Sequence, residues 1–284
     1  MEKIGIIIDS TFYLPKDFIK KHDLHVVSLN VIENDNTHKE LDIDNDFIYA
    51  KQDEKAKLTT SQPSPSEFLE AYEAAFAKGH EKLLVLTLSP GLSGTYQSAM
   101  LAKSMLEKPE AVHIFDTQNA AYGNELLTMT LLDLLKTEKN LPAVIEALQS
   151  IIDKATLMFT VENLYSLQKG GRLSKTQAFI GTMLRVKPVI KIIDGKLQLF
   201  HKERTHKKLH DFIVNEVLND PNRTEKGTLH ARIITRDSKE NGDIIESMLK
   251  EQISNTHISR TETLGPVFTI HVGPKGFGIC WFWN

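Results

Sequence analysis

Cysteine is almost absent from this sequence, since Cys280 is the only one in 284 residues. A single cysteine excludes an internal disulfide and any cysteine-rich metal site, and it fits a reducing compartment. An excess of basic residues is absent as well: 34 Lys and Arg are balanced by 37 Asp and Glu, which gives a formal net charge of -3. Without a broad positive field the chain has no general attraction for DNA or RNA, so we expect no nucleic-acid partner.

Long apolar runs are also missing. No stretch reaches the length that a membrane-spanning helix needs, and the run Ile4 to Ile8 near the start is too short for the apolar region of a signal peptide. We therefore expect a cytoplasmic protein without stable membrane insertion. The hydrophobic content of 41% is typical of soluble proteins, and the length suits one large domain or two ordinary ones.

The most informative stretch connects an apolar run to an amphipathic helix. Leu83 to Leu88 is predicted to form a buried strand, and Ser89 to Thr95 forms a turn rich in hydroxyl groups and glycine. Helical spacing then resumes at Ala99, Leu101, Ala102 and Met105. In an open parallel sheet such a turn lies at the carboxyl end of a strand, where free N–H groups at the helix start favour an anion. We therefore expect an acidic ligand at this turn.

The first half of the chain alternates strands and helices, which is typical of an α/β sheet. The expected strands are Ile4 to Ile8, His25 to Ile32, Leu83 to Leu88 and Ala111 to Phe115. The expected helices begin after Ser64, which has the features of an N-cap, and near Ala99, Asn119 and Pro142. The polar stretch Glu33 to Lys57 is expected to be a long, mobile connection.

The second half has a different pattern. Its expected strands are Thr156 to Val161, Pro188 to Ile193, Lys196 to Phe200, Leu229 to Thr235, His257 to Thr263 and Gly278 to Phe282. Several are spaced as hairpin partners, so we predict a mixed or antiparallel sheet with helices on one face, at about Lys207 to Leu218 and Lys239 to Gln252. We place the domain boundary near Asp153.

The predicted fold class is therefore α/β in two domains. Residues 1–153 form an N-terminal domain with a mostly parallel sheet flanked by helices and with hydroxyl-rich anion-binding loops. Residues 154–284 form a C-terminal α/β domain of the α+β type with the mixed or antiparallel sheet.

A set of short motifs occurs in order along nearly the whole chain. These motifs are Asp9-Ser10-Thr11, Thr60-Ser61-Gln62-Pro63-Ser64, Gly91-Leu92-Ser93-Gly94-Thr95, Lys169-Gly170-Gly171-Arg172-Leu173, Lys187-Pro188, and Gly265-Pro266 followed by His271-Val272-Gly273-Pro274. In this order they resemble the DegV family. Any single motif is weak, whereas the ordered set is specific.

The resemblance implies a function. Members of that family bind a long-chain fatty acid, and some serve as the binding subunit of bacterial fatty acid kinase, presenting the carboxylate to a separate kinase subunit. A lipid carrier is implied, with no catalytic machinery of its own and no cofactor beyond the bound fatty acid. Carboxylate binding is assigned to Thr60, Ser93, Arg172 and His271. Docking of the kinase subunit is assigned to a basic segment that contains Lys202 and Arg204.

The chain departs from the family pattern at two places. Lys275 stands where the family usually has glycine after the last Gly-Pro, and Ala121-Tyr122-Gly123 replaces a Ser-Met/Leu-Gly segment. Both places are candidates for altering access to the pocket or the preferred chain length. The identity of the fatty acid therefore does not follow from the resemblance.

A buried acyl chain requires apolar walls. A saturated tail of about 14 methylenes contributes on the order of 11 kcal/mol on burial before ordering costs, at ~0.8 kcal/mol for each methylene. Four apolar residues at helical spacing after Arg172 are the candidate walls: Phe179, Ile180, Met183 and Leu184. The same spacing is typical of an ordinary helix core, which is the alternative interpretation of all four.

The polar candidates also have structural interpretations. Thr60 and Ser61 are common turn residues that satisfy backbone groups. Arg172 follows two glycines, where an arginine can hold a tight turn. His271 lies between apolar neighbours, where a buried histidine often contacts no ligand.

Ser93 has a catalytic interpretation as well. Gly91-Leu92-Ser93 begins like a hydrolase elbow, but Thr95 stands where that motif needs glycine, and no His-Asp pairing can be identified from the sequence. The rival function is an enzyme that acts on a small acidic or phosphorylated metabolite at the same turn. A regulatory lipid-binding module is a further alternative.

No metal site is predicted. His206 and His210 have the spacing of a two-histidine face on a helix, but the glutamate of the H-E-x-x-H pattern is missing, and Lys207 and Lys208 repel a cation. We therefore expect a solvated helix face there. The surrounding basic run suits a partner that handles phosphate.

Overall fold

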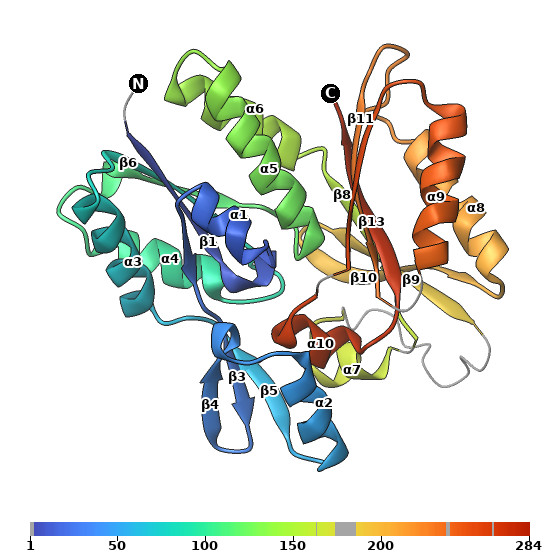
Figure 1. The fold of residues 1–284 in the computed structure, drawn as a ribbon, viewed down its shortest axis with the longest axis horizontal. Helices are drawn as coiled ribbons and strands as arrows, with labels where there is room; N and C mark the ends of the chain where they lie inside the picture. The colour runs from blue at the N-terminus through green and yellow to red at the C-terminus, as the bar shows by residue number, and fades with distance from the viewer. Residues whose placement is uncertain (1–2, 163, 174–185, 237–238, 263) are drawn as a thin grey trace.

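The computed structural model describes residues 3–162, 164–173, 186–236, 239–262 and 264–284. These residues form three sheets, which we name A, B and C (Figure 1). Sheet A is built by the first half of the chain and sheet C by the second, and the small sheet B lies at one end of the molecule. Among the described residues, no helix has both the length and the apolar character that crossing a membrane requires.

Sheet A is parallel throughout, in the order β2-β1-β6-β7. Its strands are β1 (Ile4–Asp9), β2 (Leu24–Val27), β6 (Lys82–Thr87) and β7 (Val112–Asp116). One face packs against α1 (Lys16–Lys21), α5 (Tyr122–Thr137) and α6 (Leu141–Ile152), and the other against α3 (Pro65–Ala77) and α4 (Thr95–Ser104). Burial of both faces explains the continuous apolar sequences of β1 and β6, and the predicted parallel sheet flanked by helices is confirmed.

Sheet B differs from the prediction. The stretch His25 to Ile32, expected as one strand, is divided between β2 of sheet A and β3 (Asn30–Glu33) of an antiparallel sheet in the order β4-β3-β5. The other members of this unit are β4 (Asn36–Lys39), α2 (Asn45–Asp53) and β5 (Leu58–Ser61). The prediction of a long, mobile connection is therefore wrong. Its polar sequence suits a unit with one buried side, formed mainly by Leu29, Val31 and Ile48.

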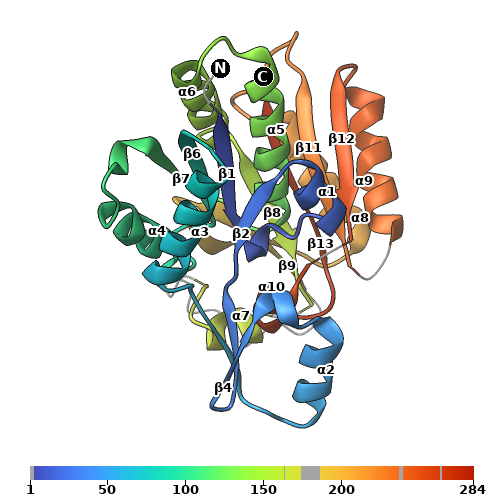
Figure 2. The same ribbon diagram turned by 60° about the vertical axis from the view of Figure 1, so that its left-hand side comes forward.

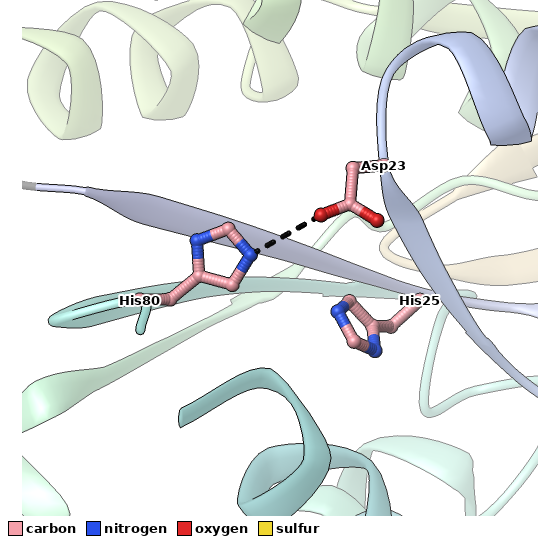
Figure 3. Close-up of side chains that lie close together, drawn as sticks. All are labelled: Asp23, His25 and His80. Atoms are coloured by element: carbon pink, nitrogen blue, oxygen red, sulfur yellow. Dashed lines mark ion pairs between the residues drawn. The ribbon is translucent and has the colours of Figure 1, made fainter. Parts of the chain in front are cut away.

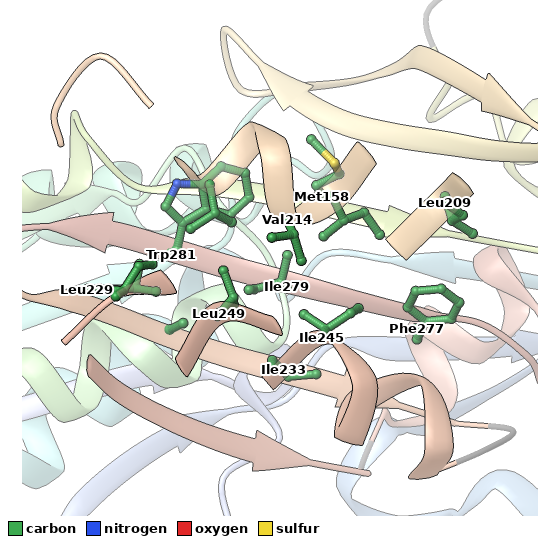
Figure 4. Close-up of a cluster of buried hydrophobic side chains, with 14 of the residues drawn as sticks. Met158, Leu209, Val214, Leu229, Ile233, Ile245, Leu249, Phe277, Ile279 and Trp281 are labelled. Carbon is green, nitrogen blue, oxygen red and sulfur yellow. The ribbon is translucent and has the colours of Figure 1, made fainter. Parts of the chain in front are cut away.

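Sheet C is mixed, as predicted, in the order β10-β9-β8-β13-β11-β12. Its strands are β8 (Thr156–Thr160), β9 (Lys187–Ile193), β10 (Lys196–Glu203), β11 (Leu229–Thr235), β12 (Thr256–Thr261) and β13 (Phe277–Trp283). Only β11 and β12 pair in parallel. Helices α8 (His206–Leu218) and α9 (Lys239–Gln252) cover one face through a core around Trp281 (Figure 4). The other face packs on α5, which therefore lies between sheets A and C.

Two short helices complete the described fold, α7 (Tyr165–Lys169) and α10 (Pro266–Val272). Helix α10 packs on α7, α2 and sheet B, and Figures 1 and 2 show it between sheet B and the end of sheet C. The buried Glu40 fixes its start, because one carboxylate oxygen accepts hydrogen bonds from the Val267 N–H at 2.9 Å and the Tyr13 hydroxyl at 2.8 Å. A helix contributed by the end of the chain is thus held by residues from its beginning.

Candidate ligand-binding site

A cavity lies where the turn after β6, strand β5 and helix α10 meet, and we name it the head cavity. It contains about 460 Å³ of space free of protein atoms, its open mouth included. Its lining residues are Leu29, Thr60, Ser61, Leu88, Leu92, Ser93, Leu167, Arg172, Leu197, Val267, Phe268, His271 and Val272. The structure therefore brings together all four polar residues singled out in the sequence, two from each half of the chain.

Thr60 and His271 contact each other directly. The Thr60 hydroxyl lies 2.8 Å from Nε2 of His271, although 211 residues separate them. The pairing of β5 with β3 holds Thr60, and the last turn of α10 holds His271. Burial, reinforced by the nearby Arg172, lowers the pKa of His271 to about 4. The imidazole is therefore neutral at pH 7, and its Nδ1 is buried without a hydrogen-bond partner.

Arg172 supplies the positive charge of the head cavity. It follows Gly171, whose φ of +70° turns the chain after α7. Its Nε donates to the Leu92 carbonyl at 3.3 Å and its Nη1 to the Gly170 carbonyl at 2.6 Å. Within the described part of the chain, no acidic side chain pairs with this guanidinium, which is half-buried. It therefore keeps N–H groups for an anionic ligand.

The turn after β6 is more self-contained than the sequence suggested. The N–H groups of Leu92 and Ser93 both donate to the Ser89 carbonyl, at 3.0 and 3.3 Å, so they are not free to bind an anion. The Ser93 hydroxyl lies 2.9 Å from the hydroxyl of Thr95. Helix α4, which starts here, has no side-chain cap at Gly94. The anion-receptive groups at this turn are therefore the hydroxyls and the uncapped start of α4.

A second cavity adjoins the head cavity, and we name it the tail cavity. It also contains about 460 Å³ of atom-free space. Its lining residues are Ala120, Ala121, Tyr122, Leu157, Phe159, Thr160, Val161, Leu197, Ile234, Arg236, Leu264, Phe268, Val272, Lys275, Gly276 and Phe277. Leu197, Phe268 and Val272 line both cavities, so side chains of α10 and β10 form a wall that the two cavities share.

The walls of the tail cavity were not identified from the sequence. The predicted walls, Phe179, Ile180, Met183 and Leu184, lie outside the described residues. The observed walls come from α5, β8, β10, β11, α10, β13 and the loops beside them, and only the tertiary arrangement makes these segments neighbours. One signal was present: both departures from the family pattern line this cavity, with Ala121 and Tyr122 on one side and Lys275 on another.

The basic segment lies at the end of β10, the strand that carries Leu197. Lys202 and Arg204 are both exposed. Between them, Glu203 pairs with His201, whose Nε2 lies 2.9 Å from the carboxylate. The next residue, Thr205, caps α8 by accepting the Lys208 N–H. The segment is thus held in place on both sides while the two basic side chains face outward.

The expectation for His206 and His210 is only half right. His206 is exposed, but His210 is 5% exposed and its Nε2 lies 2.8 Å from Oδ1 of Asn241 on α9. The prediction of a solvated face is therefore wrong for His210, because α9 packs over that side of α8. The sequence spacing alone does not show this contact.

Two adjoining, largely apolar cavities, one of which also carries a group of polar side chains, suit an amphipathic ligand. The chain matches the family model described as "Uncharacterised protein, DegV family" over residues 3–284. A DegV domain-containing protein of Staphylococcus aureus is 31% identical over 280 residues, which cover 98% of this chain and 96% of the relative. The chain therefore belongs to the DegV family.

Two solved structures share the fold. A fatty-acid-binding DegV family protein from Thermus thermophilus is 29% identical with a TM-score of 0.87, covering 99% of this chain and 100% of that one. DegV from Bacillus subtilis, described as a fatty acid binding protein, is 28% identical with a TM-score of 0.83, and each chain is covered to 100%. The α/β fold with a parallel and a mixed sheet is thus that of known DegV structures.

Proposed function

We propose that this protein binds a long-chain fatty acid, with the carboxylate in the head cavity and the acyl chain in the tail cavity. The observation that carries the proposal is that the two cavities adjoin each other, since Leu197, Phe268 and Val272 line both. The fatty-acid binding of the T. thermophilus and B. subtilis proteins supports it. A polar pocket alone would suit many small anions, whereas the attached apolar cavity favours a long hydrocarbon.

The head cavity contributes orientation. Arg172 is the only Lys or Arg among the described lining residues, and the hydroxyls of Thr60 and Ser93 lie in the same cavity. Hydrogen bonds from such donors to a carboxylate contribute roughly 1.5 to 3 kcal/mol each. Because His271 is neutral and bonded to Thr60, its role is to orient the Thr60 hydroxyl rather than to supply charge.

Lipid identification tests the proposal. The protein is purified under native conditions, its mass is measured by native mass spectrometry, and the ligand is extracted after denaturation. We expect one long-chain fatty acid per protein, and rebinding of the same acid after delipidation. A protein that carries no acid and does not bind added long-chain acids would contradict the proposal.

The enzyme alternative finds less support in the geometry. Ser93 is hydrogen-bonded to Thr95, and the imidazole of His271, which lines the same cavity, is bonded to Thr60 through Nε2. A serine nucleophile needs a base within hydrogen-bonding reach. Turnover of a small acidic or phosphorylated substrate by lipid-free protein would nevertheless favour the enzyme and is the assay to run beside lipid extraction.

We further propose that a fatty acid kinase subunit docks on the basic segment at Lys202 and Arg204. Both side chains are exposed at the end of β10, whose Leu197 lines both cavities, and an arginine suits a partner that handles phosphate. The docked subunit would act on the carboxylate in the head cavity.

Arg204→Ala tests the docking. We expect it to weaken binding of a purified kinase subunit while the lipid content stays unchanged, and Lys226→Ala, at an exposed lysine remote from β10, serves as the control. Loss of lipid from Arg204→Ala, or unchanged docking, would refute this division of roles. If the wild-type protein binds lipid but no kinase subunit, the regulatory lipid-binding module is favoured instead.

A further inference from the structure

A second cluster of polar side chains lies at the amino-terminal edge of sheet A, opposite the edge that carries the head cavity. Asp23 lies in the turn before β2, His25 lies within β2, and His80 lies between α3 and β6. Figure 3 shows the three side chains gathered there, with one nitrogen of His80 facing the Asp23 carboxylate. One ligand atom from each residue lies within 4.8 Å of the other two.

The fold positions both histidines. In the register of β1 with β2, His25 is paired with Ile7, and Gly5 lies two residues earlier on the same face of the sheet. A Cβ atom at Gly5 would lie 3.0 Å from two carbon atoms of the His80 ring. The missing side chain at Gly5 therefore leaves the space that the His80 ring occupies, beside His25.

The nitrogens of these histidines have no partners that explain their burial. Nε2 of His25 and both ring nitrogens of His80 are shielded from solvent and make no hydrogen bond. His80 Nε2 lies 3.5 Å from an oxygen of the Asp23 carboxylate, which is an ion-pair distance rather than a hydrogen bond. An acceptor left without a partner in this way destabilises the fold unless something else binds it.

We propose that Asp23, His25 and His80 bind one divalent transition-metal ion of the zinc class. Two imidazole nitrogens and a carboxylate oxygen are ligands that zinc prefers, and an external fourth ligand such as water completes the tetrahedron. Ligand atoms around a tetrahedral zinc are about 3.4 Å apart. The cluster must therefore contract slightly, which the exposed Asp23 side chain can do by rotating. The expectation from the sequence that no metal binds is revised at this place.

Lys78 competes with the metal for Asp23. Its Nζ lies 2.6 Å from one oxygen of the carboxylate, while the other oxygen faces His80. The C-terminus of α3 lies at Ala77, three residues before His80, and the partial negative charge of a helix C-terminus favours a cation. Removing the lysine charge should therefore strengthen metal binding.

Isothermal titration of ZnCl₂ into full-length protein, stripped with a chelator and dialysed, tests the proposal. We expect one zinc ion per protein, and at least about tenfold weaker binding in His25→Ala and His80→Ala because each loses one ligand. Lys78→Gln should bind zinc more tightly than the wild type. His206→Ala, at the other histidine pair, is the control and should titrate like the wild type.

Two results of this titration would overturn the proposal. The first is wild-type zinc binding in both His25→Ala and His80→Ala, and the second is loss of binding in His206→Ala. If a histidine variant fails to fold, Co²⁺ added to the wild-type protein decides. Imidazole-bound Co²⁺ in a tetrahedral site absorbs visible light, and Zn²⁺ should abolish that absorption at one equivalent. Absence of the absorption overturns the proposal.

Discussion

The head and tail cavities contain similar atom-free space and are both lined mainly by apolar residues, but they differ in their polar groups. Hydroxyl groups, an imidazole and a guanidinium also line the first, whereas almost only carbon atoms face the second. In the proposed function, the head cavity fixes which end of the ligand enters, and the tail cavity supplies most of the affinity. The two cavities are also built differently. Individual hydrogen bonds position the polar side chains of the head cavity, whereas the packing of many apolar side chains shapes the tail cavity.

Filling the space at the wall that the two cavities share has the largest expected effect. Val272→Trp places an indole at a wall that both cavities share, so the acyl chain no longer reaches the tail cavity. We expect fatty-acid affinity to fall more than about 100-fold, measured by competition with a fluorescent fatty acid on delipidated protein. Leu101→Trp, on a residue of α4 that is 55% exposed, is the control. Wild-type affinity in Val272→Trp would contradict the proposed position of the acyl chain.

A second prediction concerns Glu40, which holds the start of α10, the helix that carries Phe268 and Val272. Burial raises its pKa to about 7 from a usual value of 4.5, so the folded protein binds this proton more tightly than the unfolded chain. Stability should therefore fall as pH rises between these two values, by on the order of 3 kcal/mol from this group.

Glu40→Gln removes the titration, so urea unfolding at several pH values should show a flatter dependence than in the wild type. The slope that remains comes from Glu125 and Asp9, because burial raises the pKa of Glu125 to about 7 and that of Asp9 to about 6. Glu70→Gln, on the exposed side of α3, should keep the wild-type dependence. Parallel curves for the wild type and Glu40→Gln would show that Glu40 does not bind the proton.

Removing the charge of the head cavity should have a smaller effect and a selective one. Arg172→Ala loses charge-assisted hydrogen bonds, so we expect roughly 10- to 100-fold weaker binding of a fatty acid. The methyl ester of the same acid lacks the charge, and its affinity should stay unchanged. The ratio of the two affinities is the measurement, and equal losses for acid and ester would place the carboxylate elsewhere.

The smallest effect is expected at Lys275, an exposed residue that lines the tail cavity. Nζ of Lys275 lies 3.5 Å from the Glu162 carboxylate, and both side chains are more than half exposed, at 57% and 58%. Such a pair contributes little to stability. Lys275→Ala should therefore raise affinity only for the longest acids, by at most about threefold, because a rim contact is worth under 1 kcal/mol.

A series of acids of increasing length measures the Lys275 effect. Lys239→Ala is the control, because it breaks a similar exposed pair with Glu262 that lies outside the cavity lining. An equal gain for short and long acids would show that Lys275 acts on something other than chain length.

Local patterns predicted the elements that local contacts build. Ser64 caps α3 as expected, with its hydroxyl accepting the Glu67 N–H and its own N–H donating to the Glu67 carboxylate. The apolar run at Leu83 to Leu88 is β6, shifted by one residue. The four polar residues of the head cavity were also identified, because they lie in motifs that the family resemblance connects.

Long-range contacts explain what was missed. The strand expected from His25 to Ile32 breaks at Leu29, whose N–H donates to the Ser10 hydroxyl at 2.9 Å, and no local pattern marks that partner. Helix α10 was not predicted because its seven residues are too few for a periodic pattern. The tail cavity has no sequence pattern of its own, since Leu157, Phe268 and Lys275 become neighbours only through the sheet order.

The anchoring of α10 has a consequence for ligand exchange. A helix of seven residues does not persist alone in water, so α10 depends on Glu40, Tyr13 and the surface of sheet B for its shape. Unwinding it would open the wall that the two cavities share while leaving sheets A and C intact, which offers a bound hydrocarbon a way out. If the protein binds a fatty acid as proposed, we expect amide hydrogen exchange in α10 and the rate of lipid release to rise together.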